Sequence, residues 1–315
     1  MLELIKLRKR LLRSLGFNKS RARNVAISGV LPDPRRHAYR GDLAAEPLRG
    51  LVKSKRYAEG EPRQVSVPSL PLRREPRFGA TLYTEALLGE TVTVYDESEG
   101  WAWVQLSRDG YVGYMPCEGL VSAITTPTHR VAMLRTYLYP KPDIKSPPLA
   151  LLSLNSLLSA AGEEGGFLAL RSGGFVVAEH ARPVEQVAED FVAVALGFLG
   201  TPYLWGGRTS LGVDCSGLVQ LASEAAGLAC PRDSDMQAAE LGRPLDWRGT
   251  DRLARGDLVF WDGHVGIMAS AESLLHASAH VVVEPFAAVR LRIKATGREV
   301  TCVRRLPRVA AVETR

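Results

Sequence analysis

One cysteine of this chain lies where a helix is expected to begin, directly behind a glycine-rich turn. The turn, residues 200–207, contains Pro202 and paired glycines, which do not continue a helix. Apolar residues then recur at helical spacing until Gly227 ends the run. Cys215 therefore falls in the first helical turn, where unpaired backbone N–H groups and the helix dipole favour a thiolate and stabilise an oxyanion beside it. This position makes Cys215 a candidate nucleophile.

A thiol nucleophile needs a base, and two histidines further along the chain qualify. His264 and His276 lie in apolar, strand-like segments, and residues 256–261 form a third such segment just before them. We therefore expect a short antiparallel sheet that presents both imidazoles. His264 would take the thiol proton and return it to the leaving amine, while His276 would fix the tautomer of His264. His280 competes with His276 for this third position if the strand register differs.

The remaining cysteines lie in apolar or mixed segments and are interpreted as small buried hydrophobic residues: Cys117, Cys230 and Cys302. A zinc site built from Cys215, His264 and His276 is an alternative to the catalytic interpretation. The chain contains no Cys-x-x-Cys pair, and Cys215, His264 and His276 are not spaced as the short ligand pairs typical of zinc sites. We expect neither a metal nor an organic cofactor.

Composition limits the possible classes of protein. A chain of 315 residues suits two or three domains, and its hydrophobic fraction of 46% is that of a soluble globular protein. No apolar run approaches the roughly 20 residues needed to cross a bilayer, so stable membrane insertion is not expected. The four cysteines are too few and too widely spaced for a disulfide framework, which is compatible with a reducing compartment.

The net charge of +6 comes mostly from the N-terminus, where the first 23 residues contain eight Lys and Arg and one acid, Glu3. These charges interrupt the uncharged stretch of about 7–15 residues that a secretory signal needs, so we expect a cytoplasmic protein. The segment is interpreted as an amphipathic helix on anionic lipid, a solvated tail or the product of an upstream start codon. No basic groove with interleaved aromatic residues follows it, so nucleic-acid binding is not expected.

Residues 65–124 follow an all-β pattern with alternating strand-like segments, and Asp109-Gly110 marks a hairpin. Short strands joined by tight turns indicate a small barrel. A fainter copy of the same glycine, aromatic and turn spacing extends over residues 125–184. Before the first barrel, within residues 1–64, a short helix is expected at 44–51.

The last part of the chain, residues 185–315, opens with an amphipathic helix expected at 187–198. Within it, several motifs follow in one order: Pro-Tyr-x-Trp-Gly-Gly, Asp-Cys-Ser-Gly, Pro-Arg-x-Ser, Gly-Asp-Leu-x-Phe, His-Val-Gly-Ile and a later histidine. Together they resemble the NlpC-type cysteine peptidases of bacterial cell-wall peptide, which have a circularly permuted papain-like fold. The resemblance implies Cys215 as nucleophile, His264 as base and His276 as the orienting residue. It also implies that Tyr203 lies beside the oxyanion site.

Residues 65–124 resemble a bacterial SH3-like domain, and the fainter copy suggests a second one. The implied fold is α+β, with a papain-like catalytic domain behind two SH3-like barrels. In family members with this order the first barrel narrows the cleft, which then accepts the free N-terminus of a short peptide. The residues carried over are Asp214, Glu85 and Tyr114 for the amine of an N-terminal L-Ala, and Ser216, Arg232 and Ser234 for the D-Glu carboxylate. Glu85 and Tyr114 are equally compatible with solvated strand positions, and Ser234 or Asp233 with a helix N-cap.

The expected function is hydrolysis of the γ-D-glutamyl–diamino acid bond of murein stem peptides with a free N-terminal L-Ala, releasing L-Ala-D-Glu for cell-wall peptide recycling. One alternative is a hydrolase that is exported to the cell envelope and acts on intact peptidoglycan. Another is a catalytically weak murein-binding protein. The sequence does not choose between meso-diaminopimelate and lysine as the diamino acid.

Overall fold

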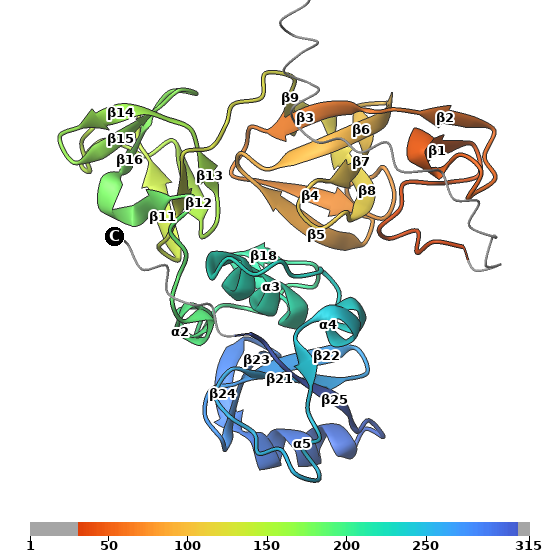
Figure 1. Cartoon of the computed structure of the whole chain (residues 1–315). Coiled ribbons are helices and arrows are strands. Elements are labelled where there is room, and N and C mark those ends of the chain that lie inside the picture. Colours follow the sequence, from red (N-terminus) through yellow and green to blue (C-terminus); the bar gives the residue numbers. More distant parts are fainter. Residues whose placement is uncertain (1–30, 308–315) are drawn as a thin grey trace, which may run out of the picture. The chain divides into compact units, whose positions relative to one another are not determined.

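The computed structural model of the chain describes residues 31–307 (Figure 1). The basic segment at the N-terminus lies outside these residues. Within the described range, the helices are too short or too polar to cross a bilayer.

A seven-stranded antiparallel sheet forms the first β domain, with the strand order β5-β4-β8-β7-β6-β3-β9. Its strands are β3 (Glu61–Val65), β4 (Ser69–Arg73), β5 (Leu82–Leu87), β6 (Thr91–Ser98), β7 (Trp101–Leu106), β8 (Val112–Pro116) and β9 (Leu120–Val121), and a 3-10 helix, η2 (Cys117–Gly119), precedes β9. Along β6 the side chains alternate, with Val92 and Val94 buried in the core, as the sequence predicts. The hairpin between β7 and β8 is also confirmed, and Gly110 there has a φ of +77°.

The segment before this domain covers the outer face of its sheet. The elements are β1 (Leu43–Ala45), the 3-10 helix η1 (Glu46–Leu48) and β2 (Arg56–Ala58), and β1 and β2 pair in parallel. The helix expected at 44–51 is wrong: Leu43 to Ala45 form a strand, and only one 3-10 turn follows, with a proline at its start. Trp103 and Val112 are buried against this segment, so β7 is covered on both faces.

Residues 129–183 form three small antiparallel sheets around one apolar cluster that includes Val131, Leu152 and Val176. The strands are β10 (His129–Val131), β13 (Leu157–Leu158) and β17 (Ala181–Pro183) in one sheet, β11 (Arg135–Leu138) and β12 (Ala150–Ser153) in the second, and β14 (Ala160–Glu164), β15 (Phe167–Leu170) and β16 (Phe175–Val177) in the third, with η3 (Ala178–His180) as a 3-10 turn. The domain boundaries expected from the sequence stay predictions.

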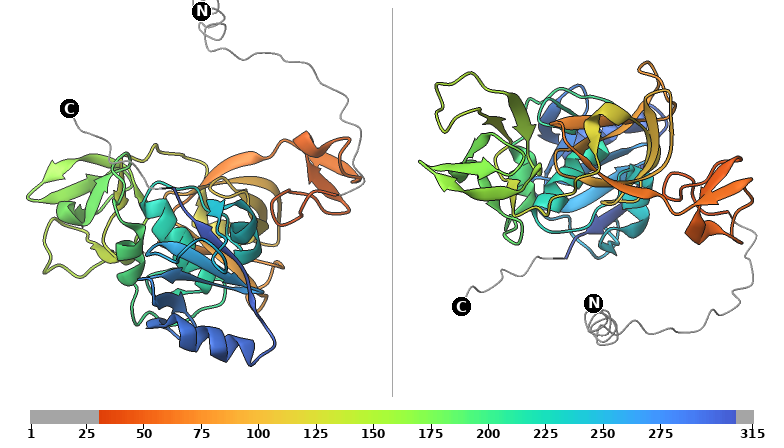
Figure 2. Two further views of the ribbon diagram at one scale, coloured as in Figure 1. Left: turned by 60° about the horizontal axis from the view of Figure 1, so that its bottom comes forward. Right: turned by 90° about the horizontal axis from the view of Figure 1, so that it is seen from above.

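The last part of the chain contains a six-stranded antiparallel sheet with helices on both faces (Figures 1 and 2). In sheet order, its strands are β20 (Arg243–Pro244), β25 (Val300–Arg305), β21 (Asp257–Trp261), β22 (His264–Met268), β23 (Ser273–Ala277) and β24 (Val281–Pro285). Along β21, Leu258 and Phe260 pack in the cluster with helix α3 (Cys215–Ala225), whereas Val259 and Trp261 pack with helix α5 (Phe286–Lys294). Residues 258–261 are buried on both faces for this reason, and the predicted order of three antiparallel strands is confirmed.

The other elements of this part surround α3: α2 (Phe191–Leu196), the hairpin of β18 (Arg208–Thr209) and β19 (Gly212–Val213), and α4 (Ser234–Glu240). The helix expected at 187–198 is shorter than predicted. Asp190 has an extended backbone and its carboxylate accepts hydrogen bonds from the N–H groups of Val192 and Ala193, so the helix begins only at Phe191.

Candidate active site

Helix α3 begins at Cys215 because Asp214 ends the extended turn before it and caps the helix. Asp214 has a φ of −94° and a ψ of 177°, and its Oδ1 accepts a hydrogen bond from the Gly217 N–H at 2.7 Å. The glycine-rich turn packs directly on this first turn of the helix, since a Cβ at Gly217 would lie 2.4 Å from the Gly207 carbonyl oxygen. Cys215 is thus held at a helix N-terminus, as the sequence predicts.

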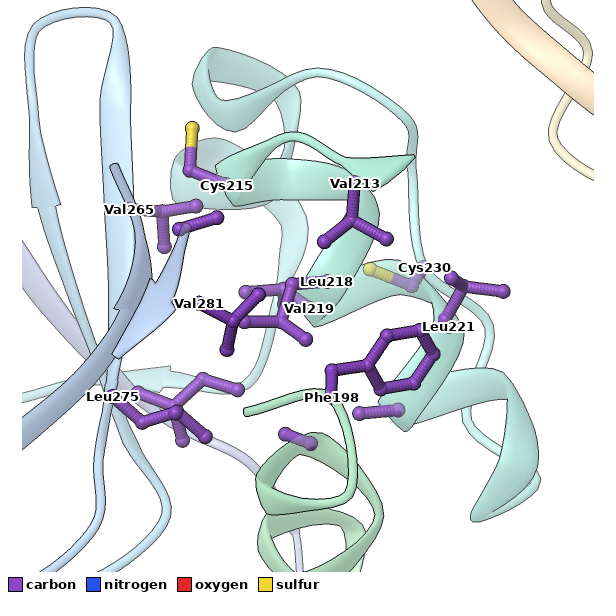
Figure 3. Close-up of a cluster of buried hydrophobic side chains, with 14 of the residues drawn as sticks. Phe198, Val213, Cys215, Leu218, Val219, Leu221, Cys230, Val265, Leu275 and Val281 are labelled. Carbon is purple, nitrogen blue, oxygen red and sulfur yellow. The ribbon is translucent and has the colours of Figure 1, made fainter. Parts of the chain in front are cut away.

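The thiol of Cys215 is buried beside the strand that contains His264. Only 6% of the cysteine is exposed, and it lies next to Val265 at the edge of the apolar cluster (Figure 3). The backbone N–H groups of Val265 and Ser216 act on the sulfur so as to lower the pKa of the thiol. Because Val265 directly follows His264, the nucleophile and the proposed base belong to neighbouring segments of one site.

The two predicted histidines face each other across adjacent strands. Nε2 of His264 on β22 lies 2.9 Å from Nδ1 of His276 on β23, with the ring centroids 5.1 Å apart. The Nδ1 of His264 is therefore the ring nitrogen left for the thiol. His280 is exposed and takes part in an isolated bridge with Pro202, so the structure places His276, not His280, against His264.

The resting site is neutral, which differs from the thiolate expected at a helix N-terminus. Burial raises the pKa of the Cys215 thiol to about 11, and the carboxylate of Asp214 acts in the same direction. Burial also lowers the pKa of His264 to about 3, with His276, Arg298 and Arg292 adding to the effect. Loss of water contact therefore outweighs the helix N-terminus, so that near pH 7 Cys215 is a thiol and His264 a neutral imidazole.

Asp214 and Arg232 form a buried ion pair next to the nucleophile. Arg232 is 1% exposed and donates from both Nη atoms to the Asp214 carboxylate, at 2.6 and 2.9 Å. It also donates to the Ser216 Oγ and, from Nε, to the Thr84 Oγ1, each at 2.9 Å. Arg232 thus joins the loop before α4 to the start of α3 and to β5 of the first β domain.

Of the other predicted residues, Tyr203 and Glu85 come near this site. Burial raises the pKa of Tyr203, and so does the neighbouring Cys215. Glu85 on β5 accepts a hydrogen bond from the Arg208 N–H at 2.8 Å, and burial raises its pKa against the opposing effect of Arg208 and Arg232. Ser234 is half-buried as the first residue of α4, and the N-cap position belongs to Asp233, which makes no side-chain capping bond.

Tyr114 is a correction to the predicted set. Its hydroxyl accepts a hydrogen bond from Arg40 Nη1 at 3.1 Å, and its ring packs in the cluster between the sheet and the N-terminal segment. Alternation along β8 is the physical reason, because Met115 points into the core of the sheet and Tyr114 points to the opposite, outer face.

Two groups of residues near the site were not predicted from the sequence. Glu284 and Arg292 continue the hydrogen-bonded chain beyond His276. Arg35 of the N-terminal segment forms ion pairs with Asp233 and Asp235 at the start of α4. No local signal marks these residues, because each meets its partner only through the packing of distant segments.

A buried thiol at a helix N-terminus, a neutral imidazole on the adjacent strand and a second imidazole behind it define a papain-like cysteine hydrolase. Residues 200–297 match the NlpC/P60 family model, and residues 72–120 match the bacterial dipeptidyl-peptidase SH3 domain. These matches confirm the resemblance of the catalytic part and of the first β domain.

The chain is 34% identical over 220 residues to the gamma-D-glutamyl-L-lysine dipeptidyl-peptidase of Bacillus subtilis, an alignment that covers 62% of this chain and 72% of the relative. It is 29% identical over 231 residues to dipeptidyl-peptidase 6 of Lysinibacillus sphaericus, covering 66% and 84% of the two chains. A crystal structure of an NlpC/P60 family protein from Bacillus cereus shares the fold, with a TM-score of 0.65 over 78% of this chain and 100% of that one, at 23% identity. The chain belongs to the NlpC/P60 family of cysteine peptidases.

Proposed function

We propose that this peptidase hydrolyses the γ-D-glutamyl–diamino acid bond of murein stem peptides that have a free N-terminal L-Ala, and that it releases L-Ala-D-Glu. The observation that supports this best is the half-buried carboxylate of Glu85 on the first β domain, beside the peptidase residue Arg208. Among the ion pairs of residues 31–307, none involves Glu85. The ammonium group of a substrate N-terminus would supply the missing cation.

In this proposal the Cys215 thiol gives its proton to Nδ1 of His264 and attacks the γ-carbonyl carbon. Tyr203 and the first N–H groups of α3 face the oxyanion of the tetrahedral intermediate. The intermediate collapses as His264 returns the proton to the departing diamino-acid amine, which leaves a thioester of L-Ala-D-Glu. Water, deprotonated by His264, then hydrolyses the thioester.

The ion pair between Asp214 and Arg232 is the basis for the contacts that we propose between the rest of the pocket and the substrate. Asp214 is already bonded to Arg232, Gly206 and Gly217, so it shapes the amine pocket and Glu85 makes the main contact with the ammonium group. Ser216 and Ser234 are proposed to contact the D-Glu carboxylate, with the positive charge of Arg232 behind them.

The test is incubation of the protein with L-Ala-γ-D-Glu-meso-diaminopimelate, its L-lysine counterpart and the N-acetylated form of each, followed by mass spectrometry. We expect L-Ala-D-Glu from the free peptides only, and no product with the Cys215→Ala variant. Equal cleavage of the acetylated peptides would indicate an exported hydrolase of intact wall. Binding of murein without cleavage of any peptide would indicate a wall-binding protein.

We also propose two finer features of the fold and a cellular location. Residues 129–183 are proposed to be a second SH3-like domain, supported by their three small sheets around one cluster, and the catalytic domain to be circularly permuted. We propose the cytoplasm as the location, supported by four cysteines that are all free: Cys117, Cys215, Cys230 and Cys302. Recovery of the native protein in an envelope fraction would contradict that location.

A further inference from the structure

The series of hydrogen bonds that links His264 to His276 continues beyond His276. Nε2 of His276 lies 2.9 Å from Oε2 of Glu284 on β24, the strand next to β23. Arg292 on α5 donates to both oxygens of that carboxylate at 2.7 Å. The side chain of His276 is 2% exposed and that of Glu284 26%, so these hydrogen bonds run from a buried imidazole toward the surface.

The chemistry of these partners determines where the protons are. The carboxylate of Glu284 is ionised, since the hydrogen bonds from Arg292 and His276 lower its pKa to about 2, and an ionised carboxylate only accepts hydrogen bonds. The hydrogen of neutral His276 must therefore be on Nε2, which leaves its Nδ1 as an acceptor. His264 then donates from Nε2, and its own Nδ1 has no hydrogen.

We infer that Glu284 is a positioning residue that fixes the tautomers of both histidines, so that the bare Nδ1 of His264 is turned toward Cys215. The inference rests on the catalytic roles proposed above for Cys215 and His264. If the carboxylate were absent, the two rings would be free to exchange the direction of their hydrogen bond. The Nδ1 of His264 would then hold a hydrogen in part of the molecules and would not accept the thiol proton.

The carboxylate of Glu284 also stabilises the positive charge that develops on the imidazoles during the reaction. The charged groups that act on the two imidazoles are Glu284 from β24, Arg292 from α5 and Arg298 from the segment before β25. Cys215 on α3 is the proposed proton donor to His264. Of the charged groups, only Glu284 stabilises an imidazolium, and it raises the pKa of His276 against the lowering by burial. Arg292 keeps the carboxylate ionised and in place.

Glu284→Met removes the acceptor and keeps the length of the side chain, whereas Glu284→Gln keeps an amide oxygen that can accept from His276. For Glu284→Met we expect kcat/KM on the free peptide to fall by at least about tenfold, as when the partner of a ligating or catalytic histidine is lost. We also expect the acidic limb of its pH profile to move to lower pH, because loss of the carboxylate lowers the imidazole pKa. Glu284→Gln keeps the acceptor but loses the charge, so it should keep the tautomers and lose less activity than Glu284→Met.

The control is Glu299→Gln, which removes a carboxylate from another surface ion pair of α5, that with Lys294 at 2.7 Å, outside the histidine chain. It should leave the rate and the pH profile unchanged. A merely structural Glu284 would show a lower melting temperature in Glu284→Met with an unchanged pH profile.

The deciding measurement needs no substrate. In the full chain labelled with ¹⁵N-histidine, the ring nitrogen shifts report the tautomers of His264 and His276 directly. We expect one tautomer for each ring in the native protein and in Glu299→Gln, and a mixture in Glu284→Met. Unchanged tautomers in folded Glu284→Met would overturn the inference, whether or not the protein cleaves murein peptides. A mixture would support it even if the substrate proposal fails.

Discussion

At the scale of single residues, opposing influences act on the pKa of the Cys215 thiol. The helix N-terminus and the N–H groups of Val265 and Ser216 favour a thiolate, yet the pKa of Cys215 is raised. The hydrophobic surroundings and the negative Asp214 both disfavour a second negative charge. Proton transfer to His264 is therefore a step of the reaction and not a property of the resting enzyme.

This makes the pH dependence of alkylation a direct test. With a pKa of about 11, the reaction of Cys215 with iodoacetamide should rise roughly tenfold for each pH unit between pH 7 and 10, because only the thiolate reacts. Peptide mapping by mass spectrometry separates Cys215 from the partly exposed Cys117 and Cys302, and Cys215→Ala is the control. A plateau of the rate from pH 5 upward would instead reveal a preformed thiolate–imidazolium pair.

At the scale of elements, the start of α3 depends on close contact with the turn before it. Alanine in place of glycine inside a helix normally stabilises by about 1 kcal/mol. At Gly217 the added Cβ would lie 2.4 Å from the backbone oxygen of Gly207, a contact that no side-chain movement relieves.

We therefore expect Gly217→Ala to destabilise the protein by about 1–3 kcal/mol and to lower activity, because Cys215 lies in the same turn. Urea unfolding followed by circular dichroism measures the first effect and the peptide assay the second. Gly162→Ala is the matched control, since a Cβ there meets open space. A Gly217→Ala protein as stable and active as the native one would show that the turn can move away from the helix.

At the scale of the whole described chain, a buried cluster of charges joins the first β domain to the peptidase. Arg208 is fully buried and pairs with Glu90 of the β domain at 2.9 Å and with Glu224 of α3. Arg108 of the β domain pairs with the same Glu224 at 2.8 Å and with Asp109 at 3.2 Å. This cluster holds β5, and with it Glu85, against the peptidase.

Arg208→Met should destabilise the protein by about 3–5 kcal/mol, because it leaves Arg108 as the one cation facing the buried carboxylates of the cluster. It should also split urea unfolding into two transitions if the cluster is what couples the two domains. Arg255→Met removes an exposed pair with Asp190 at 2.7 Å and should change stability by less than about 1 kcal/mol. Equal effects of the two substitutions would contradict this role of the cluster.

The backbone conformation around the catalytic residues follows from local signals in the amino-acid sequence. Proline and paired glycines end one segment before Cys215, a capping aspartate starts the next, and alternation of apolar residues places His264 and His276 on strands. These signals are local, because they depend on the conformations that a few consecutive residues allow.

Which side chains meet, and how much water reaches them, depends on the packing of segments that are distant in the sequence. Strand register brings Glu284 to His276 and turns Tyr114 away from the site, and packing of the N-terminal segment covers the outer face of the first sheet. The neutral state of Cys215 and His264 follows from burial that several distant segments create together. Such contacts join residues far apart in the chain, so no short stretch of sequence contains them.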